Sequence, residues 1–335
     1  MNARFRIVLT VLLLGVSGGI TWQVLRQSEP VCQGRPASAW LEEYACYAGS
    51  WGGSHFGLSR ELVEQWYIEG QHAAAVIRQM GTNVVPILLR MAAARDSALK
   101  ERLFYWEPQN SMLLALKSFL PLRPTAHEQR RMALHSFQLL GPAAKGAVPA
   151  LIGLLSSKDN RVAANAATIL SFIGPEAGQA VPALIEAAKS SDTELRLRAA
   201  EALSAIGPSA ERAVDVLIEL LNDAHPNVSS CALRALGCIR ARPEVVVPLL
   251  EAALVKHPDV AIVGLGKFGA AAQSAAPSIM PFLNHSLDYV RRDATNALRQ
   301  IGVNIVTVAS VKPNGTHNLS PKTKDRAAQP PCTGR

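Results

Sequence analysis

Two short glycine motifs are spaced as in nucleotide-binding or catalytic sites. The segment Gly264 to Gly269 matches GxGxxG, which cradles a pyrophosphate where a strand turns into a helix. The segment Gly15 to Gly19 matches GxSxG, which exposes a nucleophilic serine at a sharp strand-to-helix turn. The first lies at the end of a helical apolar pattern, and the second lies inside an apolar run. Because neither follows a strand, both are interpreted as chance matches.

Metal and thiol chemistry have equally little support. The five cysteines form no CxxC pair, and the eight histidines form no HExxH or HxH motif. Cys231 and Cys238 would stand about 10 Å apart along one helix, too far for a disulfide with each other, and we expect both to be buried, unreactive thiols. Cys32 and Cys46 could bridge in an oxidising compartment. We therefore predict no catalytic, cofactor-binding or metal-binding residue, and a conditional Cys32–Cys46 disulfide.

The elements that would position any site follow from a repeat of 33 residues. Gly-Pro recurs at Gly141, Gly174 and Gly207, and a Val-x-x-Leu segment follows each time at Val148, Val181 and Val214. A repeat of this length indicates supersecondary units stacked around one continuous core, because a single unit cannot bury its apolar face alone. The pattern predicts an all-α, right-handed solenoid of helical hairpins.

Each unit is predicted to contain two helices. The first, such as 180–189, has proline in its opening turn, where the missing N–H breaks no helical bond. The second, such as 193–206, has one apolar face and ends at glycine. Aligning the second helices gives two core columns, Ala166, Ala199, Ala232, Ala261, Ala294 and Leu170, Leu203, Leu236, Leu265, Leu298.

Two departures from the repeat are expected to have structural consequences. Arg240 occupies a turn position that the other units fill with glycine. The interval from Pro248 to Pro277 is 29 residues, so this unit is four residues short, with the loss near His257. We expect a local change in curvature there.

The Gly-Pro turn, the Val-Pro-Ala-Leu first helix and the Ala-rich second helix resemble short bacterial HEAT repeats of the bilin-lyase-like type. Residues 33–41 and 78–100 are similar to HEAT-repeat proteins of Verrucomicrobia-type bacteria. The resemblance covers about 33–304 and implies an armadillo-like binding scaffold, with no activity to transfer. It leaves one alternative of another class, an enzyme similar to bilin lyases or HEAT-like DNA glycosylases.

The amino-terminal region predicts a membrane segment. Residues 7–25 contain no charge and follow Arg4 and Arg6, which is typical of a single span with a cytoplasmic N-terminus and an exported remainder. The alternative is a signal peptide cleaved near Val16-Ser17-Gly18, which would give a secreted protein. We favour the anchor and therefore a periplasmic solenoid.

The predicted organisation is an anchor at 1–27, a linker with a short docking helix at 28–57, the solenoid at 58–304 and a disordered basic tail at 305–335. The docking helix is expected at 39–44 with Ser38 as its N-cap. The solenoid is expected to begin with one helix through Tyr67 and another from Ala73 to Met80. The formal charge of +8 is mostly terminal: residues 1–30 carry +2 and residues 312–335 carry +4, which leaves +2 for the body. This distribution argues against nucleic acid as a partner.

The predicted function is a non-catalytic, membrane-anchored scaffold that binds a protein or peptide and needs no cofactor. If the second helices line the concave face, as the resemblance implies, helical projection places three positions per unit outward. They are Ala164, Thr168, Ser171; Leu197, Glu201, Ser204; Ser230, Arg234, Gly237; Asp259, Val263, Gly266; Arg292, Asn296, Arg299. From these we select a candidate partner-binding surface: Leu197, Glu201, Arg234, Asp259, Arg292, Asn296, Arg299.

Overall fold

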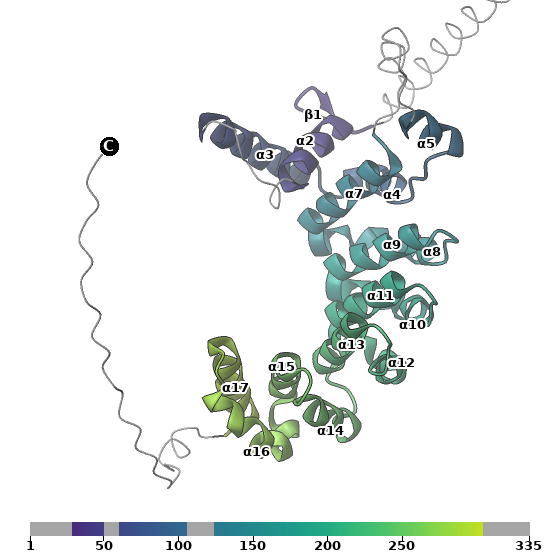
Figure 1. Cartoon of the computed structure of the whole chain (residues 1–335). Helices are drawn as coiled ribbons and strands as arrows, with labels where there is room; N and C mark the ends of the chain where they lie inside the picture. The colour runs from purple at the N-terminus through teal and green to yellow at the C-terminus, as the bar shows by residue number, and fades with distance from the viewer. Residues whose placement is uncertain (1–28, 50–59, 106–123, 304–335) are drawn as a thin grey trace, which may run out of the picture.

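The computed structural model describes residues 29–49, 60–105 and 124–303, and Figure 1 shows these residues as a curved row of helices. The predicted membrane span at 7–25, the glycine-rich segment at 49–57 beyond Gly49, and the tail at 305–335 lie outside the described residues. Among those that are described, the only β-strands form a two-stranded antiparallel ribbon, β1 (Val31–Cys32) and β2 (Arg35–Pro36).

Helical hairpins follow one another along the chain. The N-terminal part comprises α2 (Ala37–Gly49), α3 (Arg60–Met80), η2 (Gly81–Val84), α4 (Val85–Ala92) and α5 (Ala98–Tyr105). The regular part begins with α7 (Ala126–Leu140), η3 (Gly141–Ala147), α8 (Val148–Leu155), α9 (Asn160–Ile173), η4 (Gly174–Ala180), α10 (Val181–Ala188) and α11 (Thr193–Ile206). It continues with η5 (Gly207–Ala213), α12 (Val214–Leu220), α13 (Pro226–Ile239), α14 (Pro243–Ala253), α15 (Pro258–Phe268), η6 (Gly269–Ala275), α16 (Ala276–Ile279), η7 (Met280–Asn284) and α17 (Asp288–Ile301).

The two predicted core columns are confirmed. All five alanines and all five leucines have no exposed surface, and they belong to one hydrophobic cluster that runs through the described chain. Small side chains at one level let neighbouring second helices approach, and the leucines fill the next level. The long second helices α9, α11 and α13 therefore pack in single file, as do α15 and α17.

The turn after each second helix needs a residue that tolerates positive φ. Gly174 and Gly207 adopt φ of 67° and 68°, with ψ near −135°, a region that side chains with a Cβ rarely enter. Arg240 takes a left-handed conformation instead, with φ 57° and ψ 27°, and Arg242 does the same two residues later. The 3-10 segment found at the other turns is absent here, and α14 starts directly.

The short unit has the position that the sequence predicts. α15 is 11 residues long, whereas α9, α11, α13 and α17 are each 14 residues long. In Figure 1 the inner helices descend from α7 to α13 and then turn sideways through α15 to α17, which is the expected change in curvature. Pro248 lies inside α14 and not in its opening turn, because α14 begins earlier than the other first helices.

Two local expectations near the N-terminus are wrong. Ser38 is not an N-cap: α2 already begins at Ala37, and the Ser38 backbone N–H donates to Glu29 Oε2 at 3.3 Å. The helix through Tyr67 and the helix ending at Met80 are a single helix, α3, because 60–80 contains no proline and its one glycine, Gly70, is accommodated under the Tyr47 ring. The expected docking of α2 is confirmed, with Trp40 3% exposed and Leu41 fully buried.

One helical stretch of the described chain, Ala126–Leu155, is long and apolar enough to cross a membrane by composition. It consists of α7, η3 and α8, with positive φ at Gly141. Phe137 and Leu151 within it are fully buried in the hydrophobic core. The stretch is therefore a hairpin of the solenoid core.

Candidate functional site: the inner face

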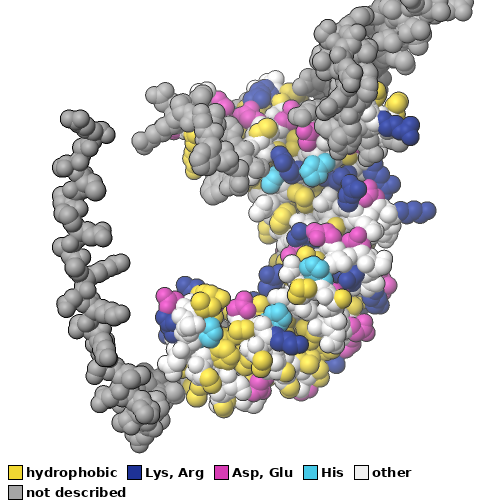
Figure 2. All heavy atoms as spheres, viewed as in Figure 1, with side chains coloured by type: hydrophobic (Ala, Val, Ile, Leu, Met, Phe, Trp, Pro, Cys, Tyr) yellow, Lys and Arg dark blue, Asp and Glu magenta, His cyan; other side chains and the backbone are white. Residues whose placement is uncertain are grey.

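The second helices α7, α9, α11, α13, α15 and α17 form the concave side of the curve, and the first helices lie behind them (Figure 1). Figure 2 shows the same body in space-filling form, hollowed on this side. The arrangement gives each unit one helix whose outward residues face the hollow. We call this set of residues the inner face.

The centre of the inner face is an ion-pair cluster around Glu201. Its Oε2 accepts a hydrogen bond from Arg198 Nη1 at 2.8 Å, and its Oε1 lies 3.9 Å from Arg234 Nη2 on the next helix. Arg198 also pairs with Glu194 at 2.7 Å. The structure thus brings the predicted residues Glu201 and Arg234 together. Leu197 lies on the same helix, half-buried and packed against the core.

The C-terminal end of the inner face carries two exposed arginines on α17. Arg299 donates from Nη1 to Asn296 Oδ1 at 3.3 Å, so these two predicted residues are also in contact. Arg292 has a side chain 71% exposed and lies 3.7 Å from its neighbour Asp293. Asp259 is exposed in the first turn of α15. This end therefore offers cations that are weakly paired and open to solvent.

Three positions projected outward are buried. Ala164, Gly237 and Gly266 are covered because the neighbouring second helix lies closer than the projection assumes. A Cβ on Gly237 would come within 2.7 Å of Gly264 Cα, and one on Gly266 within 2.9 Å of Ala297 Cα. Gly264 and Gly266 of the GxGxxG match are therefore packing residues in α15, and Gly269 is the positive-φ turn residue that follows this helix. This placement agrees with its interpretation as a chance match.

The two cysteines of α13 are half-buried and lie beside polar groups. Cys238 Sγ accepts hydrogen bonds from Ser204 Oγ at 3.3 Å and from Lys267 Nζ at 3.0 Å. Cys231 Sγ accepts one from Arg234 Nη2 at 3.2 Å, and burial raises the pKa of this thiol. The expectation of buried thiols is therefore wrong in degree. Cys238 joins α13 to the inner helices on both sides.

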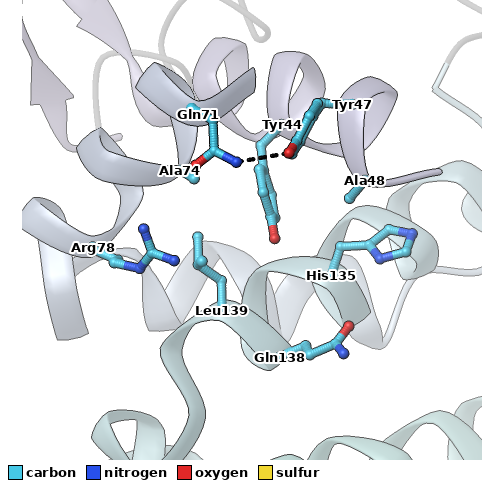
Figure 3. Close-up of a pocket in the computed structure, with 9 residues that line it drawn as sticks. All are labelled: Tyr44, Tyr47, Ala48, Gln71, Ala74, Arg78, His135, Gln138 and Leu139. Atoms are coloured by element: carbon cyan, nitrogen blue, oxygen red, sulfur yellow. Dashed lines mark hydrogen bonds between the residues drawn. The ribbon is translucent and has the colours of Figure 1, made fainter. Parts of the chain in front are cut away.

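A pocket of about 470 Å³ lies at the N-terminal end of the inner face, between α2, α3 and α7 (Figure 3). Gln71 Nε2 donates to Tyr47 Oη at 2.8 Å. Figure 3 shows Arg78 and Tyr44 turned toward the same space. The nine lining residues are Tyr44, Tyr47, Ala48, Gln71, Ala74, Arg78, His135, Gln138, Leu139. We call this space the N-terminal pocket.

The N-terminal pocket carries one full positive charge. Burial, followed by the nearby positive charge of Arg131, lowers the pKa of His135, so its ring is neutral at pH 7. Burial raises the pKa of Tyr44 in spite of the opposing charge of Arg78, so its hydroxyl keeps its proton. Arg78 is the one permanently charged side chain of the lining, which contains no Asp or Glu.

The sequence prediction missed this pocket, although one signal was available. His135 and Gln138 stand 33 residues before Thr168 and Ser171, which the projection assigned to the concave face. Extending the repeat by one unit would have placed both on the inner face. Arg78 and Tyr44 lie outside the regular repeat, so no periodicity could bring them to this place.

The predicted disulfide stays a prediction. Cys32 lies on β1, and Cys46 lies exposed near the end of α2. Within the ranges that the structure describes, no group of three or more His, Cys, Asp or Glu side chains is placed to hold a metal ion.

Comparisons with known proteins agree with this architecture. A family model of HEAT repeats matches residues 122–204 and 181–263, which include α7 to α14. No curated protein matches the sequence.

Solved structures similar to this chain include three of the karyopherin Kap121p. The structure of Kap121p bound to the extreme C-terminus of the protein phosphatase Cdc14p matches with a TM-score of 0.52 and 16% sequence identity. The match covers 79% of this chain and 28% of the karyopherin chain. The structure of Kap121p bound to Pho4p has a TM-score of 0.51 and 15% identity, and the match covers 81% of this chain and 30% of the karyopherin chain. The structure of Kap121p bound to Nup53p has a TM-score of 0.52 and 16% identity, and the match covers 81% of this chain and 29% of the karyopherin chain.

This chain spans less than a third of the length of those karyopherin chains. Identities of 15–16% establish a shared fold alone. The handedness of the superhelix stays a prediction. Residues 122–263 therefore match HEAT repeats, and the described chain has an all-α helical-repeat solenoid fold similar to that of the karyopherin structures.

Proposed function

We propose that the inner face binds an extended segment of a partner protein. The observation that carries the proposal is the row of second helices, which present exposed polar and charged side chains to one continuous hollow. Solenoids create such extended concave surfaces through the small rotation between successive repeats. Arg234 and Arg292 are 50% and 71% exposed and have only long contacts with carboxylates, so they can pair with a ligand.

The structural neighbours support a protein or peptide partner. Kap121p has been solved bound to the extreme C-terminus of Cdc14p, and also bound to Pho4p and to Nup53p. A shared fold alone does not carry a partner from one protein to another. The likeness therefore supports the class of ligand, a protein segment, and the exposed arginines support its recognition by charge.

The test compares two triple variants in affinity capture from cells that express this chain. The inner-face variant changes Arg234, Arg292 and Arg299 to Glu. The control variant changes Arg90, Arg212 and Lys256 to Glu, three exposed cations that lie off the inner helices. We expect the inner-face variant to lose at least one partner that both the unaltered protein and the control retain. Identical partner sets for all three proteins would reject the inner face.

We also propose that residues 7–25 anchor the solenoid to a membrane with the N-terminus cytoplasmic. The support comes from the sequence: an uncharged run of 19 residues preceded by two arginines. Protease added to intact cells and to spheroplasts tests the topology, because an exported solenoid is cleaved only after the outer layers are removed. Cleavage that requires lysis of the inner membrane would contradict export, and release by alkaline carbonate would contradict the anchor.

A further inference from the structure

We propose that the N-terminal pocket binds the carboxylate side chain of an Asp or Glu residue in the partner segment. The pocket combines one unneutralised arginine, Arg78, with a tyrosine hydroxyl, Tyr44, in a space of about 470 Å³. The inference rests on the proposed function in one respect: the carboxylate is taken to belong to a segment that lies on the inner face.

The charge of the pocket calls for an anion with a single charge. Arg78 stands in the last turn of α3 and is exposed, and none of the nine lining residues is acidic. Residues 50–59, which connect α2 to α3 in the chain, contain no Asp or Glu either. An arginine binds a carboxylate through two parallel N–H···O bonds, and the protonated Tyr44 hydroxyl can donate a third. One cation matches a carboxylate better than a doubly charged phosphate.

The aromatic wall of the pocket is held in place before any ligand arrives. The Tyr47 ring lies so close to the α3 backbone that a Cβ on Gly70 would be 2.1 Å from Tyr47 Cγ. The ring also meets Tyr67 edge-on, with centroids 5.8 Å apart, and its hydroxyl accepts from Gln71. Glycine inside a helix is destabilising relative to alanine. Gly70 makes room for the Tyr47 ring, so the pocket wall loses little further conformational freedom when a ligand binds.

The position of the pocket selects a side chain of a bound segment over a free anion. His135 and Gln138 stand one repeat before Thr168 and Ser171, which are half-exposed on α9. A segment that follows the inner helices toward the N-terminus therefore reaches the pocket. Tyr44, Tyr47 and Leu139 can contact the methylene groups of a glutamate side chain while its carboxylate meets Arg78.

The direct test uses N-acetyl-glutamate methylamide, which carries one side-chain carboxylate and no other charge, and N-acetyl-glutamine methylamide as its neutral match. Binding to the full chain in detergent is measured by saturation-transfer NMR. A ligand of this size binds with a Kd on the order of 1 mM. We expect the glutamine compound to bind about tenfold more weakly, since it loses a charge-assisted bond pair.

Two substitutions assign the preference to the pocket. R78Q is expected to abolish the tenfold preference, and Y44F to reduce it about threefold through loss of one hydrogen bond. R90Q, on the exposed surface of α4, serves as the matched control and should leave the preference unchanged. Equal binding of the two compounds would overturn the proposal, as would a preference that survives R78Q.

A competition experiment separates the carboxylate from other anions. Inorganic phosphate at equal concentration is expected to displace little of the glutamate compound. Displacement to the same extent would overturn the assignment to acidic side chains and would indicate a general anion site. Because the probe is a single residue, its binding does not depend on Arg234, Arg292 or Arg299. A pocket that fails this test leaves the inner-face proposal standing. Failure of the inner-face proposal would leave the carboxylate preference of the pocket intact but would remove the partner segment as the source of the carboxylate.

Discussion

Arg196 forms the most extensively bonded ion pair between units in the described chain. Its Nε and Nη2 donate to the two oxygens of Asp223 at 2.7 and 3.1 Å, and its Nη1 donates to the carbonyls of Ser190 and Ser191, each at 3.0 Å. The side chains of Arg196 and Asp223 are 16% and 6% exposed. The guanidinium therefore joins two successive loops that connect first and second helices.

We expect R196M to lower the free energy of unfolding by about 3 kcal/mol. Methionine keeps most of the apolar stem, but it removes the ion pair and leaves the carbonyls of Ser190 and Ser191 without this donor. Asp223 would then keep the hydrogen bond from the His225 N–H, at 2.8 Å, as the contact that stabilises its charge. Removing one partner of a buried pair costs about 3–5 kcal/mol, and partial solvent access places this pair at the lower end.

The assay is urea unfolding followed by circular dichroism, with R198M as the matched control on the same helix. Arg198 also makes ion pairs, but its side chain is 34% exposed, so its loss should cost about 0.5 kcal/mol. Hydrogen exchange should show the loss of protection concentrated in α11 and α13, since solenoid units interact mainly with their neighbours. Equal losses of stability in R196M and R198M would contradict the larger contribution assigned to the buried Arg196–Asp223 pair.

The same pair predicts a pH dependence. The Arg196 hydrogen bonds hold the pKa of Asp223 below its ordinary value of 3.8, against the opposing effect of burial. A carboxyl group whose folded pKa is depressed stabilises the fold above its unfolded pKa and loses that contribution as pH falls through the folded pKa. The stability difference between the unaltered protein and R196M should therefore be full at pH 7 and shrink below about pH 4.

Three further predictions concern local backbone features, each measured by urea or thermal unfolding. G237A should destabilise the protein by about 2 kcal/mol, because its Cβ would meet Gly264 Cα at 2.7 Å. As the control, G153A has open space around its Cβ and should stabilise the protein by up to about 1 kcal/mol. Similar effects of the two substitutions would contradict the close approach of α13 and α15. R240G should stabilise by about 1 kcal/mol by relieving a left-handed arginine, and a loss would contradict that strain. T125A should cost about 1 kcal/mol through loss of the capping box of α7, and no change would contradict its role.

The regular part of the fold could be predicted because the repeat samples the same physical environment several times. Ala199 and Ala232 occupy equivalent places, so the small-residue column and the leucine column beside it follow from alignment alone. The short unit could be found by counting residues between prolines. The positive-φ turn at Arg240 could be found because glycine fills that place in other units.

The remainder depends on distances between helices, which a projection of one helix does not contain. Gly237 projects outward on α13, yet it is buried because Gly264 lets α15 approach closely. The N-terminal pocket depends on α2 and α3, which do not follow the 33-residue repeat. Tyr44 and Arg78 therefore had no equivalents to align, and their convergence on His135 required coordinates.

The most direct test of inner-face binding is site-specific photo-crosslinking in cells. A benzoylphenylalanine placed at Thr168, half-exposed on α9, is compared with one at Glu219 on the outer helix α12. If the partner segment binds at the inner face, position 168 gives a discrete protein adduct and position 219 gives none of the same mass. Adducts from position 219 alone, or the same adduct from both positions, would contradict binding at the inner face.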